Sequence, residues 1–228
     1  MPFSQNALSI SPFRLQVEMG QSILNISGEV VGGKVEIKGT APVIHSDDLP
    51  ISIPLHRPMS VSNLEVKGEI DGTFVQVTAL RGSMFDGQFN AKGTWDGHTA
   101  FQSTGELRGM KVEQILKVLR PNPVRADGTG AMNWKIKGTV LPQKAPSLSG
   151  RAQMTIVNGQ LIGVDLLQRI EQVLKLKNRL SDRRGVTKFS KFQGELEFLE
   201  EQFPLKSILL AGHEKEFLMH GSGHVNRD

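Results

Sequence analysis

Side chains that carry out metal or acid–base chemistry are few and dispersed in this sequence of 228 residues. The six histidines lack the short spacings of a metal site. His220 and His224 are four apart, but a glycine-rich strand pattern does not bring them to one helical face. Asp47 and Asp48 are adjacent, so they would point oppositely on a strand and are interpreted as solvated loop carboxylates. The sequence therefore predicts no metal site and no catalytic carboxylate pair.

Motifs for nucleophilic catalysis and for phosphate binding are also missing. The chain has no cysteine, which excludes disulfides, thiolate metal sites and a cysteine nucleophile. The Gly-Thr-Gly at 128–130 lacks the following helix of a phosphate-binding loop. The Gly-Ser-Gly at 221–223 has no recognisable His and Asp partners for its serine. We therefore predict a protein that is not an enzyme and has no cofactor.

Composition and charge are those of an ordinary globular protein, with 38% hydrophobic and 22% charged residues. The net charge is +4, and the charges are interspersed, whereas a nucleic-acid-binding protein concentrates its cations in a patch. No signal peptide is visible at Met1, and no apolar run approaches the ~18 residues of a membrane span. Because the charges are interspersed, nucleic acid is not an expected partner.

A seven-residue pattern recurs along the chain: apolar, polar, apolar, polar, glycine, polar, apolar. Its copies lie at 24–30, 35–41, 64–70, 89–95, 101–107, 134–140 and, less regularly, 217–223. The period of two predicts half-buried β-strands, with the apolar residues and the glycine on the same face. Glycines placed repeatedly on the apolar face allow a sheet to curve. The alternative is that they are ordinary strand-end glycines of a β-sandwich.

Turn signals separate these strands. Gly32-Gly33, Asp71-Gly72, Asp86-Gly87, Asp96-Gly97, Asp127-Gly128 and Asn158-Gly159 are all predicted at strand junctions. The unequal intervals between repeat glycines favour a meander with loops of different length. The proline-rich stretch 41–59 is predicted to be an extended loop or edge segment. We predict a mainly β protein: one long curved antiparallel sheet, a trough or groove, in a single domain over 1–228.

Two short amphipathic helices interrupt the strand pattern. The first spans 112–119 and is ended by Pro121 and Pro123; the second runs from about Asp165 to about Leu180. The second helix has a basic face, followed by Arg183 and Arg184. Such a face binds an anionic membrane surface in some proteins, and in more of them it is simply solvated.

From about Phe101 to the end, the sequence resembles the AsmA-like C-terminal region of bacterial envelope proteins. The resemblance lies in a strand and helix at 105–116, a strand at 126–138, a strand, Asn-Gly and Gly-x-Asp-Leu pattern at 148–167, and a Thr-x-Phe turn at 187–194. Phe192 replaces the usual aliphatic residue of that turn. The first half of the chain is compatible with further strands of the same sheet.

The resemblance implies a sheet curled into a trough with an apolar interior, and a role in moving phospholipid across the periplasm or in outer-membrane assembly. The expected partners are phospholipid acyl chains and envelope membranes or outer-membrane assembly proteins. Because family members carry an N-terminal membrane anchor, the chain is expected to be the C-terminal portion of a longer protein in the periplasm, tethered to the inner membrane.

The leading hypothesis is a non-enzymatic lipid-binding or lipid-transfer module for phospholipid transport and outer-membrane homeostasis. Its groove is predicted to be lined by the apolar repeat residues Leu24, Ile26, Val35, Ile37, Leu64, Val66, Phe89, Trp95, Trp134, Ile136 and Met219. The alternative is a structural or chaperone-like module that assists outer-membrane protein assembly through its sheet edges. In that case the core would be closed and dry.

Overall fold

The structure, a computed structural model, describes residues 12–49, 56–119, 125–139, 147–162, 185–200, 203–212 and 218–225. These residues form strands and two short helical elements. The elements are β1 (Phe13–Met19), β2 (Ser22–Val31), β3 (Lys34–His45), the 3-10 helix η1 (Ser46–Asp48), β4 (Ser60–Asp71), β5 (Phe74–Met84), β6 (Gly87–Trp95), β7 (Ala100–Lys111), α1 (Val112–Leu119), β8 (Arg125–Thr139), β9 (Ser147–Ile162), β10 (Val186–Glu200), β11 (Phe203–Gly212) and β12 (Leu218–Val225).

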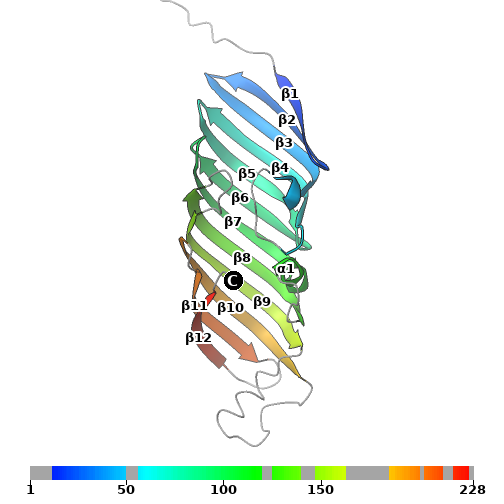
Figure 1. The fold of residues 1–228 in the computed structure, drawn as a ribbon, viewed down its shortest axis with the longest axis vertical. Coiled ribbons are helices and arrows are strands. Elements are labelled where there is room, and N and C mark those ends of the chain that lie inside the picture. The colour runs from blue at the N-terminus through cyan, green and yellow to red at the C-terminus, as the bar shows by residue number, and fades with distance from the viewer. Residues whose placement is uncertain are drawn as a thin grey trace, which may run out of the picture.

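All twelve strands belong to one sheet, in which the spatial order is the order along the chain. Every neighbouring pair is antiparallel. Figure 1 shows the strands stacked as a tall, twisted ladder from β1 at one end to β12 at the other. The predicted mainly β meander is confirmed.

The repeat glycines lie inside strands, as the period of two predicts. They are Gly28, Gly39, Gly68, Gly93, Gly105, Gly138 and Gly221, in β2, β3, β4, β6, β7, β8 and β12. Because each strand is followed by its own neighbour in space, a short turn suffices for most connections. Gly32-Gly33, Asp71-Gly72, Asp86-Gly87 and Asp96-Gly97 lie at such connections, as predicted.

The prediction of turns at Asp127-Gly128 and Asn158-Gly159 is wrong, because both dipeptides lie inside long strands, β8 and β9. The two strands pair across this point, with Asp127 opposite Gln160 and Thr129 opposite Val157, and the register shifts between these pairs. Gly128 and Asn158 have φ of 134° and 51°. Local positive φ therefore produces a β-bulge that bends two continuous strands instead of ending them.

The helix predicted over 112–119 is confirmed as α1. The second helix, predicted from about Asp165 to about Leu180, lies outside the described residues. The loop or edge segment predicted over 41–59 is correct only in part, because β3 continues to His45. Pro42 is tolerated there because the β2–β3 pairing ends at Asn25 and Thr40, so its missing N–H removes no ladder bond on that side.

The sheet is curved toward its apolar face. Leu107 of β7 is fully buried, although the described sheet has a single layer. Side chains from β4 to β9, together with Ile115 of α1, pack against the cluster of Phe89, Leu107 and Met110. A concave surface favours such convergence of side chains from several strands, and Ile115 of α1 also covers the cluster.

Candidate functional site: the apolar face of the sheet

One row of directly paired residues crosses all twelve strands and contains only apolar residues and glycine. Directly opposed residues of antiparallel strands project to the same face, so the row defines one side of the sheet. We call it the central row; it consists of Leu15, Ile26, Gly39, Val66, Leu80, Ala91, Gly105, Trp134, Ala152, Leu196, Leu205 and Gly223.

A second row beside it, the glycine row, alternates large and small residues from one strand to the next, except that Gly93 and Ser103 are both small. Its members are Phe13, Gly28, Ile37, Gly68, Val77, Gly93, Ser103, Ile136, Gly150 and Phe198. Each large side chain except Phe13 and Phe198 therefore has a small residue on both sides. The arrangement leaves shallow notches between apolar side chains along the face.

Several of these glycines have no room for a side chain. A Cβ on Gly68 would collide with the carbonyl oxygen of Gln76, and one on Gly93 with that of Gln102. The colliding atoms belong to the backbone of the neighbouring strand, so they cannot move aside as a flexible side chain would. The glycines thus permit a close backbone approach and the curvature that the repeat predicts.

The structure places the predicted lining residues on one face. Ile26, Val66 and Trp134 belong to the central row, and Ile37 and Ile136 to the glycine row. Val35 and Trp95 continue a third row with Ile70, Val75 and Phe101. Leu24, Leu64 and Phe89 pair with Val17, Ala41 and Leu107 on the other side of the central row. Met219 pairs with Leu210, and its side chain lies outside the described part of the chain.

Sequence reasoning missed other residues of this face, and all of them except Leu107, which ends the copy at 101–107, lie outside the heptad pattern. Leu15, Leu80, Leu107, Met132, Leu196 and Phe198 are in the same or adjoining rows. Alternating apolar residues within β1 and β10 are the signal that would have found Leu15, Leu196 and Phe198. Leu80 is out of phase with Val75 and Val77, because the register shifts between Val77 and Leu80.

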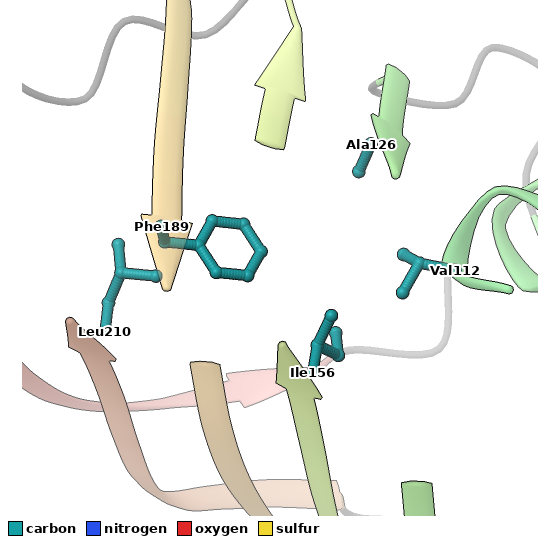
Figure 2. Packing of buried hydrophobic residues seen from close by; sticks show 5 residues of the cluster. All are labelled: Val112, Ala126, Ile156, Phe189 and Leu210. Carbon is teal, nitrogen blue, oxygen red and sulfur yellow. The ribbon is translucent and has the colours of Figure 1, made fainter. Parts of the chain in front are cut away.

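The helix α1 covers one part of the apolar face. Val112 of this helix forms a buried cluster with Ala126, Ile156, Phe189 and Leu210, and these side chains point toward one another in Figure 2. The C-terminal carbonyl of Val118 accepts hydrogen bonds from the backbone N–H groups of His56 and Arg57, at 2.8 and 3.3 Å. These bonds fix the helix, which lies against β8 and the end of β7.

Away from α1 the apolar face is open. Leu24, Ile26, Val35 and Ile37 are only half-buried, and Leu15 of β1 is 56% exposed. In the row of Val35, Trp95 is 44% exposed. An apolar face loses about 25 cal/mol of stabilisation for each Å² left in water, so this surface gains free energy from any apolar ligand that covers it.

Hydrogen bonds join the start of β2 to the end of β3 and to η1; we call this group of residues, Gln21, Ser22, His45 and Asp48, the clasp. The Ser22 hydroxyl donates to Asp48 Oδ2 at 2.5 Å and accepts from the His45 N–H at 2.9 Å; the Gln21 N–H also donates to Asp48. The Ser22 hydrogen bond holds the pKa of the Asp48 carboxyl below its ordinary value of 3.8, against the opposing effect of desolvation. Asp48 therefore has a structural partner, which corrects its interpretation as a merely solvated loop carboxylate.

The opposite, polar face carries shallow hollows. A hollow of about 440 Å³ is lined by Gln102, Lys135, Lys137 and Arg151 of the polar face, and also by Ser103, Ile136, Gly150 and Phe198 of the glycine row. A neighbouring hollow of about 390 Å³ shares Gln102 and Lys137 with it and adds Phe74. The polar face is therefore not a uniform surface of solvated charges.

In the described ranges, no group of three His, Asp or Glu residues is placed to hold a metal ion. Among the same residues, no helix has the length and apolar character needed to cross a membrane. The largest organised feature is the apolar face.

Comparison with known proteins supports one family. The sequence profile of the AsmA family matches residues 54–200, which is more than half of the chain and begins earlier than the resemblance read from Phe101 onward. No curated protein and no solved structure matches the chain significantly. The chain belongs to the AsmA family, generally non-enzymatic envelope proteins that are implicated in lipid transport and outer-membrane integrity.

Proposed function

We propose that this chain is a non-enzymatic lipid-binding or lipid-transfer module of the periplasm, tethered to the inner membrane by a segment outside this chain. Its apolar face holds phospholipid acyl chains and serves phospholipid transport and outer-membrane homeostasis. The observation that carries the proposal is the central row, which is apolar or glycine on all twelve strands without interruption.

The dimensions of the face suit acyl chains. Twelve strands at a spacing of about 4.8 Å give a path of roughly 50 Å. The hydrocarbon core of a bilayer is about 30 Å thick, so the chains of one leaflet extend about half that distance. The path is therefore long enough for more than one acyl chain in succession.

The energetics favour extraction of an acyl chain by a face of this kind. Each CH₂ group that is kept from water contributes about 0.8 kcal/mol. An apolar path therefore replaces much of the free energy that the bilayer core provides by keeping an acyl chain from water. The half-open strand ends at Val35 and Trp95 leave room for a polar headgroup to remain in solvent. The proposed role makes and breaks no bond.

A structural or chaperone-like role in outer-membrane protein assembly is the second candidate, and one observation favours it. Within the described sheet, β1 pairs with β2 alone, so its other edge offers backbone groups to an incoming strand. The side chain of Leu15 on this edge strand is 56% exposed. A client strand added at β1 would pair by β-augmentation.

Native mass spectrometry of the chain purified from a bacterial host, with lipid extraction from the same sample, tests the proposal. We expect phospholipid to co-purify in a defined ratio. A stably folded, lipid-free protein that also takes up no phospholipid from added vesicles would contradict it. Binding of β-strand peptides by that lipid-free protein would then favour the assembly role.

A further inference from the structure

Four cations gather on the polar face of β6–β9, opposite the apolar face. Lys92, Thr104, Lys135 and Arg151 are directly paired from β6 to β9, and Lys137 lies in the next row between Gln102 and Ser149. All four cationic side chains are exposed. We call Lys92, Lys135, Lys137 and Arg151 the basic patch; it extends over about 14 Å across the strands.

Among the described residues, no carboxylate forms an ion pair with a cation of this patch. Lys135 and Arg151 face each other directly, an arrangement in which like charges destabilise a sheet. Glu106 on β7 instead bonds Arg108 at 2.7 Å, and Glu195 accepts from Gln153 at 3.3 Å. Glu197, opposite Arg151, lines the hollow at the patch, and Asp96 lines the neighbouring hollow that shares Lys137. The patch therefore keeps an excess of positive charge.

The same face has the opposite character near the N-terminal end of the sheet. Glu29, Glu36 and Glu69 are directly paired across β2, β3 and β4. Lys38 and Lys67 also oppose each other there, but Glu36, Glu65 and Glu69 flank them along their own strands. The N-terminal end of the polar face thus lacks the excess of positive charge found on β6–β9.

The surroundings of the basic patch match a membrane surface. The hollow of about 440 Å³ is lined by Lys135, Lys137 and Arg151 together with the hydroxyl-bearing residues Thr104 and Ser149. Two large apolar side chains border the two hollows on the same face: Leu199 is 47% exposed and Phe74 is 44% exposed. Cations that can reach phosphates, with exposed apolar side chains beside them, are the groups that hold a protein at an anionic bilayer.

We propose that the basic patch docks this domain onto an anionic bilayer through the phosphate groups of its lipids. The contact lies on the face opposite the acyl-binding surface, so the apolar path stays free while the domain is held at the membrane. The inference goes beyond the proposed function and does not depend on it, because it rests on the charges of the other face.

Flotation with vesicles tests the docking surface. The vesicles are pure phosphatidylcholine or phosphatidylcholine with about one third phosphatidylglycerol, and the proteins are the wild-type chain, the double variant Lys135→Gln/Arg151→Gln and the matched control Lys38→Gln/Lys67→Gln. Each cation at an anionic surface strengthens binding about fivefold, so the first variant should lose about 25-fold in affinity and the control less than about threefold. Both variants lose two positive charges, and the cations elsewhere in the chain are the same in both. A difference between the two variants therefore reports on the position of the lost charges.

The results separate the alternatives. The proposal is supported if only Lys135→Gln/Arg151→Gln loses affinity for the anionic vesicles and if wild-type binding to these vesicles weakens at higher salt. Equal losses in both variants, or equal binding to the two kinds of vesicle, would overturn it, as would tight binding of inorganic phosphate without vesicle binding. Thermal unfolding checks that each variant is folded. If the double variant Lys135→Gln/Arg151→Gln is not folded, the single variant Lys137→Gln replaces it, and its affinity for the anionic vesicles should fall about fivefold. Co-purified acyl lipid, measured separately, reports on the proposed function and should be unchanged.

Discussion

Trp134 and Gly105 are direct cross-strand partners, and the indole ring of Trp134 occupies the space that a side chain at position 105 would need. The ring is held in place by a hydrogen bond from its Nε1 to the Ser103 hydroxyl, at 3.1 Å. A Cβ on Gly105 would also contact Ala91 Cβ at 2.8 Å. The glycine of β7 thus makes room for the largest side chain of the central row.

Replacing Gly105 with alanine should destabilise the protein. The added methyl group collides with the tryptophan ring and with the neighbouring strand, and overpacking of this kind costs about 1–3 kcal/mol. Chemical denaturation monitored by circular dichroism measures the change in the free energy of unfolding. The midpoint should fall while the slope stays constant.

Gly39→Ala is the matched control, since Gly39 lies in the same central row. A Cβ there would meet its nearest atoms, in Leu24 and Val66, at 3.6 Å, which is an ordinary contact. Because glycine is entropically costly in a strand, this variant should be neutral or more stable by up to about 1 kcal/mol. Equal destabilisation of the two variants would contradict the steric account.

The glycine pattern could be predicted from sequence because period-two alternation is local: the residues that share a face are two apart on the same strand. Which glycines are indispensable could not be predicted, since Gly39 and Gly105 have the same local sequence pattern. Their difference arises from the partner strand, where Trp134 faces one and Val66 the other.

Features that depend on register were likewise invisible. The partner of Asp48 is Ser22, which lies 26 residues earlier. The basic patch joins cations from β6, β8 and β9 that are scattered in the sequence. Asp127-Gly128 and Asn158-Gly159 have the composition of hairpin turns, but pairing continues on both sides of them, so tertiary structure converts two turn signals into one bulge.

Asp48→Asn should destabilise the protein at neutral pH and remove part of its acid sensitivity. The folded-state pKa of Asp48 is below its ordinary value of 3.8, so its stabilisation is present above that value and is lost as the pH falls through the lowered pKa. The difference in Tm between wild type and variant should therefore shrink between about pH 5 and pH 2. Scanning calorimetry across this range measures it.

Asp47→Asn serves as the control for the clasp. Asp47 is next in sequence but accepts only a long hydrogen bond, 3.4 Å from the Ser46 hydroxyl. Its replacement should have a smaller effect on Tm at neutral pH. A difference between wild type and Asp48→Asn that stays constant with pH would show that the carboxylate charge does not contribute.

Ile136→Asp should abolish lipid pick-up while leaving the sheet folded. Ile136 lies in the glycine row between Ser103 and Gly150, on the half-open part of the apolar face. A carboxylate against an acyl chain has no hydrogen-bond partner and costs about 2 kcal/mol or more, which corresponds to about a 30-fold loss of affinity. Native mass spectrometry and binding of a fluorescent phospholipid measure the effect.

Asn133→Asp places the same charge on the same strand but on the polar face, where Asn133 is exposed opposite Gln153. Its lipid binding should equal that of the wild type. If both variants bind lipid as the wild type does, acyl chains do not contact the apolar face at Ile136.

Trp95 should report directly on lipid at the open strand ends. The chain has two tryptophans, so Trp134→Phe leaves Trp95 as the single fluorophore, at the cost of the Ser103 hydrogen bond, about 0.5–1.5 kcal/mol. Trp95 is 44% exposed and stands between Val75 and Phe101 on the apolar face. Bound lipid should shift its emission to the blue, and bromine atoms on the acyl chains should quench it.

The same sample distinguishes contact with acyl chains from contact with headgroups. Trp95 belongs to the face proposed for acyl chains. Phospholipid brominated on its acyl chains should therefore quench the Trp95 fluorescence more than iodide in solution does. Quenching by iodide should decrease when lipid binds. Quenching by iodide that is unchanged when native mass spectrometry shows bound lipid would mean that the lipid lies elsewhere. The acyl path would then exclude the ends of β5, β6 and β7, and the apolar face proposed here would be at most partly occupied.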